Sequence, residues 1–244
     1  MSTLLRLTRV ELRLFLREPF ALIFTFAFPL VVLVVLINSF PDGDEGFGGA
    51  DPSDYYLAGY VGVVIAAVGL VTVPAHVAGY REHGVLRRFR ASGVPLWAAV
   101  GAPVLVGMVM AAVGSLLLVL VGRGVYDAAA PVTLWAVLAV FVLAAASFLA
   151  LGLLIAGLAP TARAAQSLGM LLFFPLWLLS GAGPPPEVMG DGMRSVSETL
   201  PLTFVVQSLQ DPWLGADTQV LDLVVLAVLL VAAGALALRL LRSA

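Results

Sequence analysis

The chain has 244 residues, of which 61% are hydrophobic and only 11% are charged, and its mean hydropathy is +1.06. Soluble domains carry roughly 25% charged residues, so this composition excludes a soluble protein and indicates an integral membrane protein. Cysteine is absent, which excludes disulfides, thiol catalysis and thiolate metal sites.

The N-terminal segment, residues 3–18, is predicted to form an interfacial helix. At 100° per residue, Arg6, Arg9, Arg13 and Arg17 fall within one arc of about 80°, while the leucines of this segment point elsewhere. No small-residue cleavage site follows the next apolar run, so a retained membrane anchor is favoured over a cleaved signal peptide.

Six uninterrupted apolar runs follow, each long enough to cross a hydrocarbon core about 30 Å thick. They predict transmembrane helices at residues 20–39, 56–78, 95–122, 131–159, 164–182 and 219–238. The runs are apolar on every face, which excludes the alternating pattern of a β-barrel. We therefore predict an all-α integral membrane protein with one transmembrane domain over residues 1–244.

The arginines indicate the orientation of the chain, because cytoplasmic loops retain positive charge. Eleven of the thirteen lie on one side of the predicted spans: Arg6, Arg9, Arg13, Arg17, Arg81, Arg87, Arg88, Arg90, Arg163, Arg239 and Arg242. Most acidic residues lie in the opposite loops. Both termini are therefore expected to be cytoplasmic. The use of arginine without any lysine is typical of a GC-rich bacterial genome, so we expect a multi-pass protein of the bacterial plasma membrane.

The outer connection before the sixth span, residues 184–210, is long and partly apolar. Apolar side chains recur at helical spacing after the three consecutive prolines, and the segment from Pro201 to Val206 adds a second apolar piece. This pattern predicts two short re-entrant helices that dip into the outer leaflet. A loop packed over the bundle explains the same pattern equally well.

The chain carries little chemistry of its own. Without lysine, a phosphate-binding P-loop is impossible, so this chain is not an ATPase by itself. His76 and Asp222 are the ionisable candidates within or near spans, and both lie close to an interface, which disfavours ion-coupled transport. An intramembrane serine protease would need Ser180 beside His76, but the two are predicted at opposite depths. No carboxylate pair or histidine cluster predicts a metal site.

A strongly basic insert, residues 80–92, separates the second and third spans. It is predicted to be a helix in which Val85, Leu86 and Phe89 form an apolar ridge flanked by arginines, suited to docking on a cytoplasmic partner. Alternatively, the insert only fixes topology and contacts anionic lipid.

Two motifs in this chain resemble the ABC type-2 exporter permeases. Residues 82–90, Glu-His-Gly-Val-Leu followed by Arg-Arg-Phe-Arg, and the Val94-Pro95 pair are similar to the family's cytoplasmic E-x-G-x-L segment and its following basic helix. Residues 200–204, Leu-Pro-Leu-Thr-Phe, are similar to the family's segment before the last span. His83 and Val85 depart from the family's usual residues. The resemblance extends to the order of all predicted elements.

The resemblance implies a permease that pairs with a second permease chain, either a copy or a relative. Each permease binds a separate ABC ATPase subunit, which carries ATP and magnesium, so no cofactor and no nucleic acid are expected on this chain. The insert at 80–92 would be the coupling helix that receives ATP-driven motion. Its residues are Arg81, Glu82, His83, Gly84, Val85, Leu86, Arg87, Arg88, Phe89 and Arg90.

The resemblance also places the second and fifth spans along a translocation path at the permease dimer interface. The residues expected there are apolar or aromatic: Tyr60, Val64, Val68, Val71, Met170, Phe173, Phe174 and Trp177. Such a lining suits a hydrophobic or amphipathic substrate, for example a drug, an antibiotic or a lipid-like molecule. The same stripes can instead face lipid or neighbouring helices. The alternative function is a non-transport six-span protein, either an intramembrane enzyme or an assembly scaffold.

Overall fold

The computed structural model describes residues 3–40 and 47–243, and all regular secondary structure in this part of the chain is helical. Asp42, Asp44 and Glu45, which belong to the predicted acidic outer loops, lie outside the described residues. Six helical spans are long and apolar enough to cross a membrane: Pro19–Ser39, Pro52–Glu82, Trp97–Tyr126, Leu134–Leu158, Ala162–Leu179 and Val220–Leu241. The predicted all-helical, six-span architecture is confirmed.

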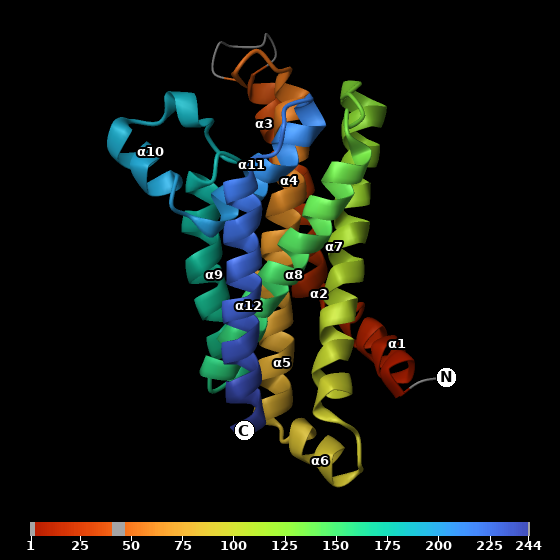
Figure 1. Ribbon diagram of the computed structural model, residues 1–244. Helices are drawn as coiled ribbons and strands as arrows, with labels where there is room; N and C mark the ends of the chain where they lie inside the picture. The colour runs from red at the N-terminus through yellow and green to blue at the C-terminus, as the bar shows by residue number, and fades with distance from the viewer. Residues whose placement is uncertain (1–2, 41–46, 244) are drawn as a thin grey trace.

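The helices form an upright bundle with both termini at one end (Figure 1). The first half of the chain contains α1 (Thr3–Phe15), α2 (Pro19–Leu22), η1 (Ile23–Ala27), α3 (Phe28–Ser39), α4 (Pro52–Ala66), η3 (Ala67–Thr72), α5 (Val73–Glu82), α6 (Val85–Ala91) and α7 (Leu96–Tyr126). The second half contains α8 (Leu134–Leu158), α9 (Ala162–Leu179), η4 (Pro186–Val188), α10 (Asp191–Ser197), α11 (Pro201–Leu214) and α12 (Val220–Ser243). The short helix α6 lies at the same end as the termini, and α10 lies at the opposite end.

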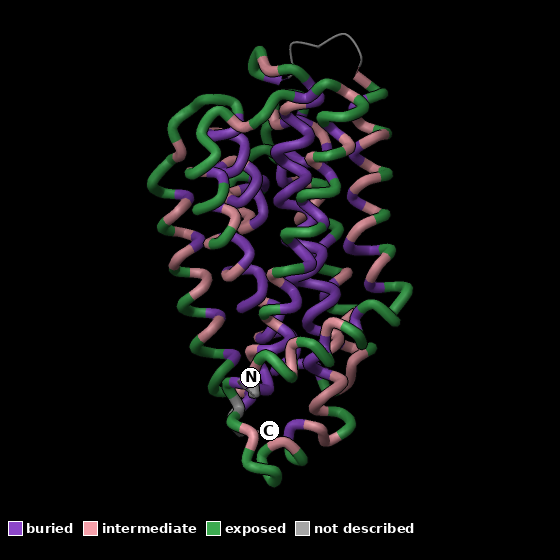
Figure 2. The backbone as a smooth tube through the Cα atoms, turned by 90° about the vertical axis from the view of Figure 1, so that its right-hand side faces the viewer, coloured by how far each residue is buried: buried purple, intermediate pink, exposed green. Residues whose placement is uncertain are grey.

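The second span, formed by α4, η3 and α5, is the central helix of the bundle. Of its most apolar stretch, 89% is buried inside the chain, against 17% for the fifth span. Figure 2 shows the buried backbone concentrated in the middle of the bundle, with exposed and half-exposed segments around it. Glycines of other helices allow this close packing, because a Cβ at Gly152 would lie 2.1 Å from the carbonyl oxygen of Gly69.

Two π-helical segments lie in the first and second spans, and each is followed by a proline. The segment Ile23–Ala27 precedes Pro29, and Ala67–Thr72 precedes Pro74. A proline inside a helix lacks the N–H that would bond the carbonyl four residues earlier, and a local π turn accommodates this loss in membrane helices. The two segments meet at a hydrogen bond between the hydroxyls of Thr25 and Thr72, which lie 3.3 Å apart inside the bundle.

The N-terminal helix α1 lies outside the bundle beside α7 (Figure 1). It ends at Phe15, three residues before the predicted boundary. Its arginines are exposed, whereas Phe15 and Glu11 are buried, with exposed fractions of 5% and 3%. The buried carboxylate shows that this helix is held by a specific polar contact as well as by its apolar face.

The segment before the last span divides into two parts with different environments. Helix α10 is mostly exposed, with Met193 and Val196 about half accessible. Helix α11 packs inside the bundle, where Val205 and Val206 contact the second span at Gly59 and Gly62. At its start, the Thr203 hydroxyl donates to the Ser197 carbonyl (2.7 Å), in place of the backbone N–H that Pro201 lacks.

Candidate functional site

The basic insert contains a helix shorter than the predicted 80–92. Helix α5 ends at Glu82, and Gly84 adopts a left-handed conformation (φ +66°) that breaks the chain before α6 begins at Val85. Glycine adopts this conformation without the steric cost that a Cβ would impose. The insert is therefore the end of a transmembrane helix, a turn and a separate seven-residue helix, Val85–Ala91.

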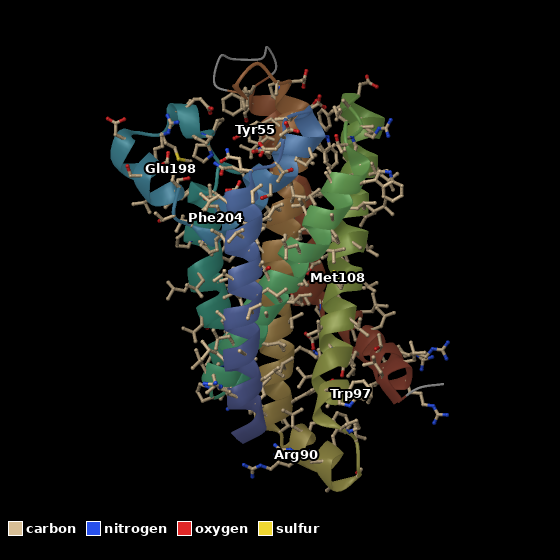
Figure 3. The ribbon with its side chains drawn as sticks, viewed as in Figure 1. Tyr55, Arg90, Trp97, Met108, Glu198 and Phe204 are labelled. Atoms are coloured by element: carbon tan, nitrogen blue, oxygen red, sulfur yellow. The ribbon has the colours of Figure 1, made fainter. Side chains whose placement is uncertain are left out.

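The faces of α6 differ from the predicted arrangement. Leu86 is only 3% exposed, and the ring of Phe89 packs edge-on against Tyr80 of α5 at a centroid distance of 6.3 Å. These two side chains hold α6 on its own bundle, so they do not form an outward apolar ridge. The outward face is basic: Arg87 and Arg90 are exposed, and Figure 3 shows Arg90 at the end of the molecule that carries α6.

Arg81 binds the C-terminal end of α8. Its Nη1 donates to the carbonyls of Ala156 (2.5 Å), Gly157 (2.8 Å) and Ala159 (3.1 Å). The last carbonyls of a helix have no partner within the helix and carry partial negative charge, so a guanidinium is favourable at this point. Arg81 therefore closes the end of α8.

The neighbouring Glu82 binds the start of α9. Its Oε2 accepts a hydrogen bond from the backbone N–H of Ala162 at 2.9 Å, where the positive end of the helix dipole favours a carboxylate. The hydroxyl of Thr161 accepts from the N–H of Ala164 in the same turn. Arg81 and Glu82 together, which we call the turn clamp, fix the end of α5 to the α8–α9 turn. Sequence reasoning assigned both residues to the coupling segment but did not predict these contacts.

A second polar cluster connects α1 to α5. The Nε2 of His76 lies 2.6 Å from Oε2 of Glu11 and 3.2 Å from the hydroxyl of Tyr80, while its Nδ1 lies 3.5 Å from a carboxylate oxygen of Glu18. The Tyr80 hydroxyl donates to the other carboxylate oxygen of Glu11. Every polar atom that Glu11 brings into the bundle is thus hydrogen-bonded, as burial of a charge requires.

The role of Glu11 was missed at the sequence level, although a signal exists. Glu11 lies four residues before Phe15 and seven after Leu4, so a helix places it on the apolar face instead of the arginine face. A carboxylate on the buried face of an amphipathic helix indicates a buried polar partner. His76 was recognised as a candidate, but its pairing with a residue 65 positions away could not be read from spacing.

Most residues predicted for the translocation path lie inside the bundle. Tyr60, Val64, Val68 and Val71 are at most 1% exposed, because the second span is the central helix and other helices surround it. Phe173 of α9 is fully buried as well, where its ring packs against Phe24 and Phe28 of the first span. That part of the predicted lining does not face an open path in this structure.

The remaining three predicted path residues lie on α9. Met170 and Trp177 are half-buried, and Phe174 is 43% exposed. The indole N–H of Trp177 donates to the Tyr60 hydroxyl at 3.1 Å, so one predicted residue from each span does meet the other.

The described residues contain no group of three or more His, Cys, Asp or Glu side chains placed to hold a metal ion. The predicted alternative of a serine protease also finds no support in the geometry. Ser180, just after α9, donates to the Trp177 carbonyl, whereas His76 contacts Glu11 near the other end of the bundle. Near the α6 end, Glu11, His76, Tyr80, Arg81 and Glu82 make helix-end contacts and inter-helix hydrogen bonds.

A comparison with protein-family models finds a match to the ABC-2 type transporter over residues 3–212. A search of curated proteins finds no match to the chain. The matched region includes α1, α6, the turn clamp and most of α11, and it covers most of the chain. Membrane domains of this family are permeases that are not catalytic themselves and act with ABC ATPase subunits. With a match over most of its length and six helices able to span a membrane, the chain belongs to the ABC-2 type transporter family, as its membrane-spanning permease component.

Proposed function

We propose that this chain is the permease half of an ATP-driven exporter in the bacterial plasma membrane. It would pair with a second permease chain, and ABC ATPase subunits would dock on α6. The substrate would be a hydrophobic or amphipathic molecule, such as a drug, an antibiotic or a lipid-like compound. The observation that carries the proposal is that α6 presents exposed arginines, while the adjoining end of α5 is hydrogen-bonded to α1, α8 and the start of α9.

The orientation follows from the distribution of charge. Both termini and α6 lie at one end of the bundle, and eleven of the thirteen arginines precede, follow or connect helices at that end. By the positive-inside rule, this end is cytoplasmic, where ATP is available to the partner subunits. The exposed Arg87 and Arg90 would then face an acidic surface of the ATPase, since charge complementarity orients such contacts.

Motion of α6 would reach the membrane by two routes. In the first, α6 pushes the end of α5, and the turn clamp carries the movement to α8 and α9, because Arg81 and Glu82 hydrogen-bond directly to that turn. In the second, Phe89 contacts Tyr80, whose hydroxyl binds Glu11 of α1. Three peripheral helices would therefore move around the central second span when the ATPase subunits close.

The path for substrate would follow the exposed face of α9. Met170, Phe174 and Trp177 remain partly accessible there, and the fifth span is the least buried of the six. A second permease chain facing α9 would enclose a mainly apolar and aromatic cavity, which suits an apolar or amphipathic substrate. Val71, a buried member of the predicted set, would support this helix from behind, since its backbone lies close to Gly169 of α9.

The test separates docking from transmission with three variants. Arg87→Glu reverses an exposed charge of α6, and Arg163→Glu makes the same change in the first turn of α9 as a matched control. Glu82→Ala removes one half of the turn clamp. For each, the tagged permease is purified in mild detergent, the co-purifying ABC ATPase is quantified by mass spectrometry, and vanadate-sensitive ATP hydrolysis and export of an apolar dye are measured.

We expect Arg87→Glu to lose most of the bound ATPase while Arg163→Glu retains it. Glu82→Ala should retain the ATPase and its hydrolysis but export less dye, because motion no longer reaches α9. Equal recovery of the ATPase with both charge reversals would contradict docking at α6. A wild-type chain that purifies without any ATPase and without hydrolysis would favour the scaffold function instead.

A further inference from the structure

A cavity of about 420 Å³ lies between α7 and α8, away from α6 and the turn clamp. It is lined by the second half of α7 and the first third of α8, including Leu116, Val119, Leu138 and Phe141. These parts of the two helices lie in the half of the bundle opposite the termini (Figure 1). The volume falls in the range of roughly 300–1,000 Å³ that is typical of small-molecule sites.

The cavity opens toward the lipid-facing surface of the bundle. Leu116, Leu134 and Leu138 line it and are also 57%, 51% and 46% exposed outside the chain. In a membrane protein such a lateral opening is surrounded by hydrocarbon, so an occupant would enter from the bilayer. An acyl chain gains little transfer free energy by moving from lipid into an apolar cavity, so preference for one occupant must come from polar groups.

Two polar side chains of α7 line this cavity, on the same helix face. Ser115 is only 8% exposed, and its hydroxyl has no hydrogen-bond partner among the described residues. Arg123, eight residues later, is exposed, and no carboxylate of the described part of the chain lies within ion-pair distance of it. Helical side chains lean toward the N-terminus of their helix, so the guanidinium is directed back along the cavity.

A second, acidic recess adjoins the cavity. It has a volume of about 630 Å³ and shares Ala130 and Trp213 with the cavity. Asp54 and Asp211 line the recess, and one carboxylate oxygen of Asp211 is buried without a hydrogen-bond partner among the described residues. A cationic group and an acidic recess therefore both border the cavity.

We propose that this cavity binds a zwitterionic phospholipid of the outer leaflet. One acyl chain occupies the apolar space between α7 and α8, the phosphate pairs with Arg123, and the ammonium of the headgroup faces the acidic recess at Asp211. The unpartnered hydroxyl of Ser115 is available to an ester carbonyl of the lipid. A purely anionic headgroup fits less well, because it would place further negative charge beside the recess. The site does not depend on the proposed export function.

The full chain is purified in detergent and mixed with phosphatidylethanolamine or phosphatidylglycerol of identical acyl chains. Bound lipid is counted by native mass spectrometry, and the melting temperature is measured with each lipid. Arg123→Gln removes the phosphate partner, and Arg194→Gln, on the exposed helix α10, is the matched control. Ala112→Phe, which places a ring in the cavity, is a second test of the acyl-chain position.

We expect one phosphatidylethanolamine per chain, with a higher melting temperature than in phosphatidylglycerol. Arg123→Gln should weaken this binding at least about tenfold, as expected for loss of one charge-assisted hydrogen bond. Arg194→Gln should bind like the wild type, and Ala112→Phe should lose the bound lipid. Equal or tighter retention of phosphatidylglycerol overturns the headgroup assignment. Equal binding by the two glutamine variants overturns the role of Arg123. An unchanged number of bound lipids in Ala112→Phe overturns the cavity itself.

Discussion

Gly169 of α9 contacts the backbone of the central helix more closely than any side chain would allow. A Cβ at this position would lie 1.9 Å from the carbonyl oxygen of Leu70 and 3.1 Å from the Cα of Val71. The carbonyl of Leu70 is the one that Pro74 cannot bond, since it lies four residues earlier in the same helix. Neither backbone group can rotate away as a flexible side chain could, so Gly169→Ala forces the two helices apart.

The size of the effect follows from the geometry. Real Cβ contacts are essentially never shorter than 3.0 Å, so moving from 1.9 Å to that limit requires a shift of about 1.1 Å. Overpacking of this kind costs about 1–3 kcal/mol, and a clash against backbone belongs at the upper end of that range. Alanine regains about 1 kcal/mol of helix propensity. The net loss should be about 2 kcal/mol, which corresponds to a melting temperature lower by roughly 4–8 °C.

Thermal unfolding in detergent, followed by the fluorescence of the four tryptophans, measures this loss. Gly234→Ala in α12 is the matched control, because the nearest atom to its added Cβ would be the Cβ of Ala150 at 4.0 Å. The control should melt at the wild-type temperature or slightly above it, since it gains propensity without a clash. If Gly169→Ala melts as high as Gly234→Ala, the close backbone contact between α9 and the central helix is refuted.

Three further perturbations test the polar contacts. Arg81→Met should lower the free energy of unfolding by about 2 kcal/mol, because it leaves the last carbonyls of α8 unpaired, and Arg81→Lys should lose less. Glu11→Ala should let trypsin cleave after Arg13 faster in limited proteolysis, because α1 loses its hydrogen bonds to α5. Burial, with a smaller contribution from Asp222, raises the pKa of Asp211, so Asp211→Asn should raise the melting temperature at neutral pH.

The stabilising effect of Asp211→Asn should depend on pH in a defined direction. A carboxyl group with a raised pKa in the folded state lowers stability once it must ionise, so the wild type loses stability as pH rises from the usual carboxyl range through the raised pKa. The benefit of Asp211→Asn should therefore be largest at neutral pH and vanish in acid. A benefit that is constant with pH would contradict a buried carboxylate. Equal melting of Arg81→Lys and Arg81→Met, or unchanged cleavage of Glu11→Ala, would contradict the other two contacts.

Several features of the candidate site could be predicted because they depend on short stretches of sequence. The basic insert, the glycine at position 84 and the apolar residues that follow identify a short helix between two spans. What spacing could not predict was the direction of its faces. Leu86 packs on the bundle and Phe89 on Tyr80, and the arginines remain outward. An amphipathic helix of two turns has one apolar face, and its own sequence does not distinguish an internal partner from an external one.

The predicted path residues illustrate the same limit for whole spans. The second and fifth spans are both apolar on all sides, so composition gives no preference for the centre or the periphery. The positions of Gly152 and Gly169 decide that the second span is central, since these two residues let α8 and α9 approach its backbone near Gly69 and Leu70. Val64 and Val68 are consequently buried, whereas Phe174 on α9 stays partly exposed.

The sequence by itself determined that this protein has six membrane spans, which end carries the positive charge and where the basic insert lies. Each of these properties is set by the length and composition of a continuous segment in a bilayer of fixed thickness. Only the tertiary structure decided that the second span is central, that Arg81 and Glu82 close the α8–α9 turn, and that Glu11 meets His76. These contacts join residues 65 or more positions apart, and they form only where helix packing brings backbones and buried polar groups within hydrogen-bond distance.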